Sequence, residues 1–179
     1  MTQVGTVYGQ ALYSLAREER LTENILSQLR LVKACFDAEP DYLSLLGSVS
    51  LPKPERCQLL DESLGKALHP YLLNFLKILV EQGKIRYFPD CFTAYQQDYY
   101  NDHNILPVTA VTAIALSQPQ TQQLKEKLAK ITGKDILLSN RVDLDLMGGV
   151  RLEYDGKQLE DSIAQRMQQM RQLLKNTVL

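Results

Sequence analysis

Residues 70–82 read PYLLNFLKILVEQ, and Leu72–Val80 within them is the longest apolar run of the chain. The run opens after a proline, which suits the first turn of a helix, and a glycine follows it. Asn74, Lys77 and Glu81 leave only a narrow polar stripe, so this helix is apolar around most of its circumference. A helix of this kind either lies at the centre of a bundle or has a face that awaits a partner. The sequence alone leaves both alternatives open.

The stretches on either side of this run also show helical periodicity. Their apolar residues recur every three or four positions, as expected for helices that each turn one face to a common core. These helices are expected over residues 4–16, 22–36, 52–65 and 89–101, with a short apolar turn at 42–46. The polar cluster Asn101-Asp102-His103-Asn104 then ends the pattern. We therefore expect a helical bundle over residues 1–104.

The remainder of the chain, residues 105–179, has a mixed pattern. Residues 107–115 are mostly β-branched or small and predict a strand. Ser117 and Gln120 form a capping-box pattern that opens a helix, and Gly133 is expected to end it. The buried face of that helix is expected to consist of Leu124, Leu128 and Ile131.

Two more strands and a last helix are expected to complete the mixed part. The strands cover residues 136–142 and 150–154, and Asp155-Gly156 is a strong hairpin-turn signal. Asp161 is expected to cap a closing amphipathic helix. The apolar stripe of that helix consists of Ile163, Met167, Met170 and Leu174. The predicted fold class is α+β, with the helices first and a small mixed domain second.

The charge balance narrows the class of partner. Of 179 residues, 20 are lysine or arginine and 21 are aspartate or glutamate, which gives a net charge of -1. A nucleic-acid binder usually has a basic excess or stripe, and neither is visible here, so proteins are the expected partners. Three dispersed cysteines indicate a reducing compartment. We recognise no signal peptide and no apolar run that approaches the roughly 20 residues needed to span a bilayer, so membrane association is expected to be indirect.

No motif for catalysis or cofactor binding is recognisable. Thr132-Gly133-Lys134-Asp135 lacks the upstream glycine and the following hydroxyl residue of a phosphate-binding loop. His69 and His103 each lie at a predicted helix boundary, where a surface or capping role is expected. Asp143 and Asp145 invite a divalent-metal interpretation, but no further carboxylates or histidines cluster with them. We expect a turn at these aspartates, with no metal and no cofactor.

Several motifs occur in a characteristic order along the chain. In the C-terminal part they are VDLDLMGGV at 142–150, Asp161-Ser162-Ile163, Arg166-Met167 and Leu173-Leu174. In the N-terminal part they are YGQALY at 8–13 with Ala16, then EQGKI at 81–85 and Leu116-Ser117. Through their order and spacing the chain resembles, over essentially its whole length, the delta subunit of F-type ATP synthases, whose mitochondrial counterpart is the oligomycin-sensitivity-conferring protein. Gly9 stands where that family usually has alanine.

This resemblance implies a six-helix bundle followed by a small α/β domain, and a stator role without catalysis or cofactor. The bundle, 1–104, would sit on the catalytic head and bind the N-terminal helix of an alpha subunit. The domain 105–179 would contact the b-type subunits of the peripheral stalk. Together they would hold the head still, so that proton-driven rotation is coupled to ATP synthesis. The resemblance also implies a single copy per complex, on the cytoplasmic side of a bacterial or thylakoid-type energy-transducing membrane.

The first and fifth helices are suitable walls for a groove that takes a partner helix. The candidate residues for the alpha subunit are Val4, Tyr8, Ala11 and Leu12 on the first helix, and Leu72, Leu76, Leu79 and Val80 on the fifth. Which of them face the partner and which face the core remains open. For the stalk, the candidates are Ile163, Met167, Met170 and Leu174, where adaptable methionines suit an interface and core packing is the alternative.

Two other functions remain as alternatives at this stage. The first is an enzyme that uses Asp143 and Asp145 with a divalent metal. The second is a nucleic-acid-binding module with a hairpin wing, against which the charge balance argues.

Overall fold

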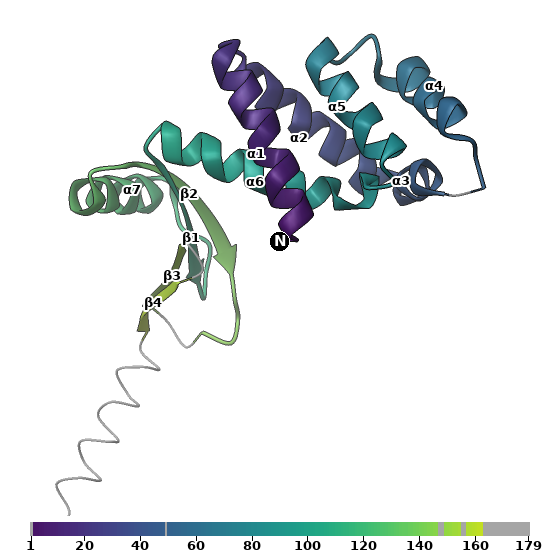
Figure 1. The fold of residues 1–179 in the computed structure, drawn as a ribbon. Helices are drawn as coiled ribbons and strands as arrows, with labels where there is room; N and C mark the ends of the chain where they lie inside the picture. Colours follow the sequence, from purple (N-terminus) through teal and green to yellow (C-terminus); the bar gives the residue numbers. More distant parts are fainter. Residues whose placement is uncertain (1, 49, 147–148, 155–156, 163–179) are drawn as a thin grey trace, which may run out of the picture. The chain divides into compact units, whose positions relative to one another are not determined.

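The chain folds as a helical part followed by a mixed part (Figure 1). The computed structural model describes residues 2–48, 50–146, 149–154 and 157–162. It divides into two compact units, Met1–Tyr99 and Tyr100–Leu179, and the division falls within the last helix of the helical part. The predicted α+β class is confirmed.

Six α-helices build the first unit. They are α1 (Gln3–Glu18), α2 (Thr22–Ala38), α3 (Pro40–Gly47), α4 (Lys53–Leu64), α5 (Pro70–Glu81) and α6 (Phe88–Asp102), with a 3-10 turn, η1 (Ile85–Tyr87), before α6. The segment predicted as a short turn at 42–46 is instead part of α3. Pro40 stops α2 but is well placed in the first turn of a new helix, where its missing N–H is not needed.

One face of α5 forms the centre of the hydrophobic core. Its side chains there, Leu72, Leu76, Leu79 and Val80, are fully buried. Aromatic rings surround them: Phe36 of α2 meets Phe88 of α6 edge to face, with ring centroids 5.1 Å apart. The sequence left two alternatives for this helix, a central position in the bundle or a face that awaits a partner. For the face with these four leucine and valine residues, the central position is correct.

The helices α1 and α6 approach each other unusually closely through two glycines of α1. A Cβ atom at Gly5 would lie 2.2 Å from the Cβ of Asp90, and one at Gly9 would lie 2.4 Å from the carbonyl oxygen of Cys91. Both distances are far below van der Waals contact, so only glycine fits at these positions without a shift of α1. These two residues set the distance between α1 and α6.

The start of α1 is also tied to α6. Thr2 is the N-cap of α1, and its hydroxyl oxygen accepts a hydrogen bond from the backbone N–H of Gly5. The Thr2 backbone N–H and hydroxyl both donate to Asp90 Oδ2, at 2.9 and 2.6 Å. These hydrogen bonds, the hydroxyl one first, hold the pKa of Asp90 below its usual value.

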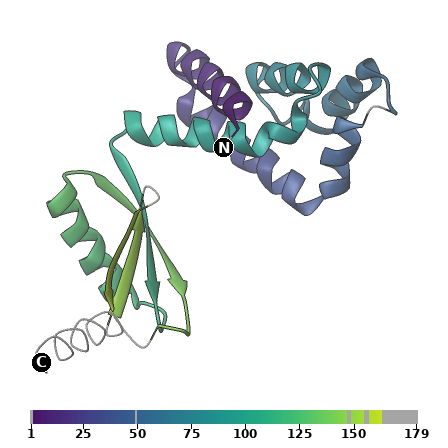
Figure 2. The ribbon, with the colours of Figure 1, turned by 60° about the horizontal axis from the view of Figure 1, so that its bottom comes forward.

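The second unit is a four-stranded sheet with one helix. Its elements are β1 (Ile105–Thr112), α7 (Gln118–Thr132), β2 (Asp135–Val142), β3 (Gly149–Tyr154) and β4 (Lys157–Ser162). The strand order is β2-β1-β3-β4, with β1 parallel to β2 and the other two pairs antiparallel. The helix α7 connects the parallel pair and lies along one face of the sheet (Figure 2).

Asp161, the residue expected to cap the closing helix, lies in β4 and pairs with Val150, and the ladder continues to Ser162 opposite Gly149. The expected closing helix lies outside the described residues. One other expectation for this unit is wrong. Ile131 is 81% exposed, because the half-buried side of α7 ends at Ala129. The hairpin predicted around Asp155-Gly156 is confirmed by the antiparallel pairing of β3 with β4.

We predict that Gly9→Ala destabilises the protein, although alanine favours a helix. The new methyl group meets the Cys91 carbonyl, so α1 must shift, which lowers the free energy of unfolding by about 1–3 kcal/mol. Urea denaturation measures the change. Gly47→Ala is the control, because its Cβ would lie 3.6 Å from Ile85, an ordinary contact. Equal unfolding midpoints for the two variants would contradict the close approach of α1 and α6.

We also predict that Asp90 makes a contribution to folding stability that depends on pH. Because its pKa is lowered in the folded state, its hydrogen bonds to Thr2 contribute stability above the usual aspartate pKa. That contribution is lost as the pH falls through the folded-state pKa. The unfolding midpoints of wild type and Asp90→Asn should therefore converge on acidification. Asp41→Asn, an exposed carboxylate on α3, is the control, and a difference for Asp90→Asn that stays constant with pH would refute the prediction.

Candidate functional site

A groove of about 380 Å³ lies between α1 and α5 on the surface of the first unit. Its lining consists of Tyr8, Ala11, Leu12 and Leu15 from α1, and Tyr71, Asn74, Phe75 and Ile78 from α5. On each helix these positions are spaced i, i+3, i+4 and i+7, which is one continuous helical face. None of the eight residues is charged.

The groove has a buried floor and an exposed rim. Leu12 and Phe75 are 4% and 7% exposed and form the floor, while Leu15 and Ile78 are 37% and 47% exposed at the rim. Exposed apolar side chains gathered along a groove of this kind are suited to the apolar face of an amphipathic helix. The chemistry available here is therefore binding, through apolar burial.

The structure shows which of the eight candidate residues line the groove and which lie in the core. Tyr8, Ala11 and Leu12 line the groove as predicted for α1, and Val4 is half-buried one turn earlier, outside the lining. The four α5 candidates do not line it. Leu72, Leu76, Leu79 and Val80 are buried in the core on the other side of the helix, so they are removed from the candidate interface.

The sequence of α5 contains a second apolar stripe, which corresponds to the groove face of the helix. It is difficult to recognise by periodicity, because a polar residue interrupts it. Tyr71, Phe75 and Ile78 form a second apolar stripe, but Asn74 lies among them and belongs to the polar positions of the helix. A second apolar stripe beside the core face gives α5 apolar surface that its own core does not fully cover.

Polar groups mark the two ends of the groove. At the end with Leu15 and Tyr71, His69 caps α5, and its Nδ1 accepts a hydrogen bond from the Tyr71 N–H at 3.3 Å. The capping role expected for His69 is thus confirmed. At the other end, Lys84 Nζ donates a long hydrogen bond of 3.4 Å to the Tyr8 hydroxyl.

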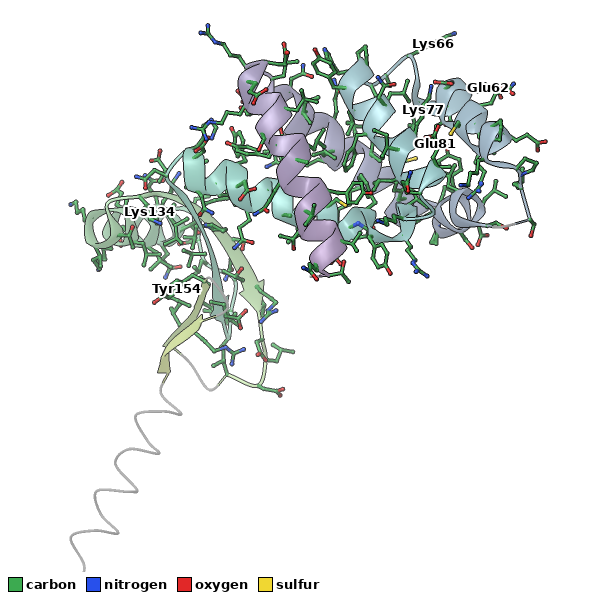
Figure 3. The ribbon with its side chains drawn as sticks, in the orientation of Figure 1. Glu62, Lys66, Lys77, Glu81, Lys134 and Tyr154 are labelled. Carbon is green, nitrogen blue, oxygen red and sulfur yellow. The ribbon has the colours of Figure 1, made fainter. Side chains whose placement is uncertain are left out.

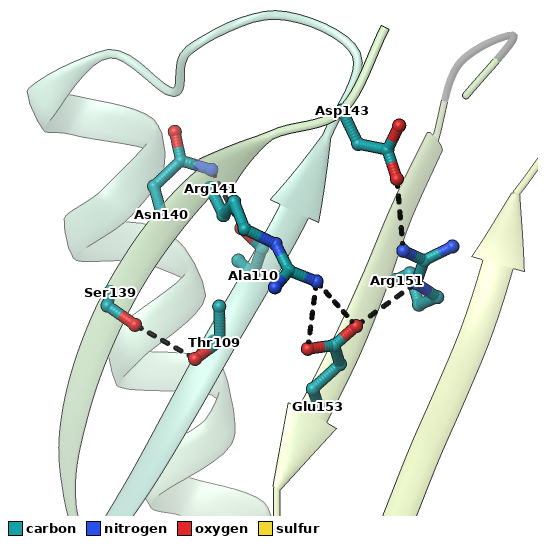
Figure 4. Close-up of polar contacts among 8 residues, drawn as sticks. All are labelled: Thr109, Ala110, Ser139, Asn140, Arg141, Asp143, Arg151 and Glu153. Atoms are coloured by element: carbon teal, nitrogen blue, oxygen red, sulfur yellow. Dashed lines mark hydrogen bonds and ion pairs between the residues drawn. The ribbon is translucent and has the colours of Figure 1, made fainter. Parts of the chain in front are cut away.

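The aspartates considered for a metal have other partners. Asp143 Oδ2 pairs with Arg151 at 3.1 Å (Figure 4). Asp143 Oδ1 accepts a hydrogen bond from the Asp145 N–H. Glu153 in turn pairs with Arg141 at 2.9 Å and with Arg151 at 3.4 Å, which ties β2 to β3 across β1. Within the described ranges, no group of three histidine, cysteine or acidic side chains is placed to hold a metal ion.

The thiols of Cys91 and Cys57 are not activated as nucleophiles either. Cys91 is 1% exposed, and burial raises its pKa to about 11. Burial is also the first cause of the raised pKa of Cys57. A thiol with a raised pKa is mostly protonated near neutral pH, and the protonated form is a poor nucleophile.

In the second unit, apolar side chains gather at one end of the sheet. Thr112 and Val142 are paired at the ends of the parallel strands β1 and β2, so the segments that follow them leave the sheet at the same end. Ile114 and Leu144, two residues further on, are 78% and 87% exposed. The end of β4 lies at this end too, because Ser162 pairs with Gly149. The predicted closing stripe, Ile163, Met167, Met170 and Leu174, lies outside the described residues.

Among those described residues, no helix is both long and apolar enough to cross a membrane.

Comparisons with known proteins agree on one family. The model of the family described as "ATP synthase delta (OSCP) subunit" matches residues 4–174. The ATP synthase subunit delta of Dichelobacter nodosus is 33% identical over 180 residues, which cover 97% of each chain. That of Clostridioides difficile is 27% identical over 172 residues, which cover 96% of this chain and 95% of the relative.

A similar fold occurs in a solved structure. A chain of the mitochondrial ATP synthase hexamer of Toxoplasma gondii superimposes with a TM-score of 0.77, at 16% identity, over 97% of this chain and 98% of that one. At this level of identity the likeness concerns the fold.

Proposed function

Because this chain belongs to the ATP synthase delta (OSCP) subunit family, we propose that it links the catalytic head of the enzyme to the peripheral stalk, so that proton-driven rotation is coupled to ATP synthesis. The chain is the stator connector of an F-type ATP synthase, and it is a non-catalytic subunit. The finer proposal concerns which surface holds which partner. The uncharged, apolar groove between α1 and α5 is the observation that carries it.

The partner proposed for the groove is the N-terminal helix of an alpha subunit. Tyr8, Ala11 and Leu12 of α1 would contact it, and Val4, on the same side of α1, would extend the contact by one turn. On α5 the contacts would come from Tyr71, Phe75 and Ile78 and their neighbour Asn74. Such a helix would cover the exposed rim and leave the core face of α5 undisturbed.

The partner proposed for the second unit is the set of b-type stalk subunits. The exposed Ile114 and Leu144 lie at the end of the sheet from which the closing segment departs. The apolar stripe Ile163, Met167, Met170 and Leu174 would contribute to the same contact. Ile114 and Leu144 would supply exposed apolar area for this contact.

The proposed location follows from the complex. The F-type ATP synthase is a membrane-associated assembly, and we place this subunit on its cytoplasmic side, in one copy, held through its protein partners.

We predict that Ile78→Gln weakens binding of a synthetic peptide that spans the alpha subunit's N-terminal helix. Burying the exposed half of the Ile78 side chain contributes about 1 kcal/mol, so the Kd should rise about fivefold. Titration calorimetry measures it. Leu31→Gln is the matched control, because Leu31 is 64% exposed on α2 and outside the groove. Absence of any binding by the unaltered chain would refute this site for the alpha helix.

We predict that Leu144→Asp reduces capture of the soluble part of the b-type subunits, because a charge then occupies an apolar contact. Ile131→Asp is the control, because Ile131 is 81% exposed near the opposite end of the sheet, where β2 begins. The double variant Met167→Glu, Met170→Glu tests the closing stripe, with Gln165→Glu, Gln172→Glu as its matched pair. Equal capture by all variants in a pull-down would count against this surface.

A further inference from the structure

One end of the α1–α5 groove differs from the other in charge. Its eight lining residues are uncharged, but Lys84 lies at the rim, against Tyr8. The Lys84 ammonium is 3.4 Å from the Tyr8 hydroxyl oxygen and 5.0 Å from the ring centroid. Tyr8 comes early in α1, and Lys84 follows the end of α5, so the cation marks a single end of the groove.

The position of Lys84 is determined by the way α5 ends. Gly83 has a left-handed conformation, with φ of 65°. The Lys84 N–H then donates to the Leu79 carbonyl at 2.7 Å, and the Gly83 N–H donates to the Val80 carbonyl at 3.0 Å. This is a Schellman motif, which ends the helix and turns the chain sharply. It holds the backbone of Lys84 in a defined place beside the groove.

No carboxylate neutralises Lys84 among the residues that the structure describes. Its only polar contact there is the Tyr8 hydroxyl, a neutral group. By contrast, Lys77 on the other side of α5 pairs with Asp61 of α4 at 2.7 Å. Lys84 is half-buried as a residue, and an ammonium with one long hydrogen bond keeps donors available for a stronger acceptor.

An uncharged groove does not by itself determine in which direction a bound helix runs. Apolar burial is non-directional, so a helix with an apolar stripe gains similar contact area whichever way it runs. A single cation at one end removes that symmetry, because only one direction and one register place an acidic side chain beside it. The charge therefore adds specificity where the apolar contacts supply affinity.

On the basis of the proposed function, we propose that Lys84 binds a carboxylate of the helix that occupies the α1–α5 groove, and thereby sets the direction and register of docking. The partner is thus an amphipathic helix with an aspartate or glutamate that lies at the Tyr8 end of the groove, next to its apolar stripe.

The test is a charge exchange in the full-length chain. Peptides of the alpha subunit's N-terminal helix are made with each acidic residue replaced in turn by lysine, and titrated against wild type and Lys84→Glu. With the unaltered peptide, Lys84→Glu should weaken binding at least about two- to fivefold, and less so at high salt. One reversed-charge peptide should bind Lys84→Glu better than it binds wild type, which identifies the paired acid.

Matched variants separate this effect from a change in the fold. Lys66→Glu makes the same change in charge in the segment before α5 begins, whereas Lys84 follows the end of α5. Figure 3 labels Lys66 and Glu81, the last residue of α5. This variant should leave the peptide affinity within about twofold. Lys84→Gln keeps most of the side chain and should reduce the salt dependence of binding. It serves in place of Lys84→Glu if that variant is unstable to urea.

The outcomes distinguish this inference from the function on which it rests. If the wild-type chain binds no peptide, the proposed function itself fails. If the peptide binds but no acidic position couples to residue 84, and Lys84→Gln has an unchanged salt dependence, Lys84 has no role in docking although the groove does. A dimer of the chain that the peptide does not dissociate, seen by sedimentation, would assign the groove to a second copy and overturn the inference.

Discussion

Leu72, Leu76 and Leu79 lie in a row along α5, and burying this row is what brings the helices of the first unit together. Each of these side chains contributes about 1.5–3 kcal/mol when it is removed from water, as an upper estimate. Because they occupy one side of α5, the neighbouring side of the helix remains for another use. The groove with α1 is the result, since α1 covers only part of the second apolar stripe. A core and a binding surface are thus two faces of one helix.

In the second unit, polar contacts contribute to the packing beside a small apolar core. Its central strand β1 buries small and β-branched side chains, namely Val108, Ala110 and Val111. Polar contacts supplement this core: Asn140 donates to the Ala110 carbonyl and accepts from the Leu116 N–H (Figure 4 shows Asn140 and Ala110), which fixes the start of α7 against the sheet. Two exposed apolar residues, Ile114 and Leu144, lie at one end of the sheet. A unit of this kind has a small core of its own and a surface suited to a protein partner.

Much of this fold is predictable from the sequence, because strong local signals agree with the tertiary structure. The prolines, the glycine ends and the capping box place most helices correctly, and Gln120 does accept from the Ser117 N–H. Local signals do not identify which face of α5 lies in the core. Its two apolar stripes are adjacent on the helix, and their separation depends on where α1 lies, which no local pattern contains. For that reason the sequence left open whether Leu72 and Leu76 face the core or a partner, and the structure buries both in the core.

Other differences come from long-range pairing. Asp161 has the chemistry of a helix cap, but the ladder between β3 and β4 continues past it, and backbone pairing prevails over a local preference. The bridge from Arg141 through Glu153 to Arg151 joins residues that only the strand order brings together. Such contacts are invisible until the topology is known.

The two glycines of α1 have a consequence for how the family diversifies. Gly5 and Gly9 bring α1 directly against α6, and neither glycine is among the residues that line the groove. The width of the groove is therefore governed by residues that never touch its occupant. Relatives with larger side chains at these positions must hold α1 further from α6, and this displaces one wall of the groove. Substitutions at residues outside the groove lining can therefore change which helix the groove binds. A comparison of the lining residues alone would not detect this effect.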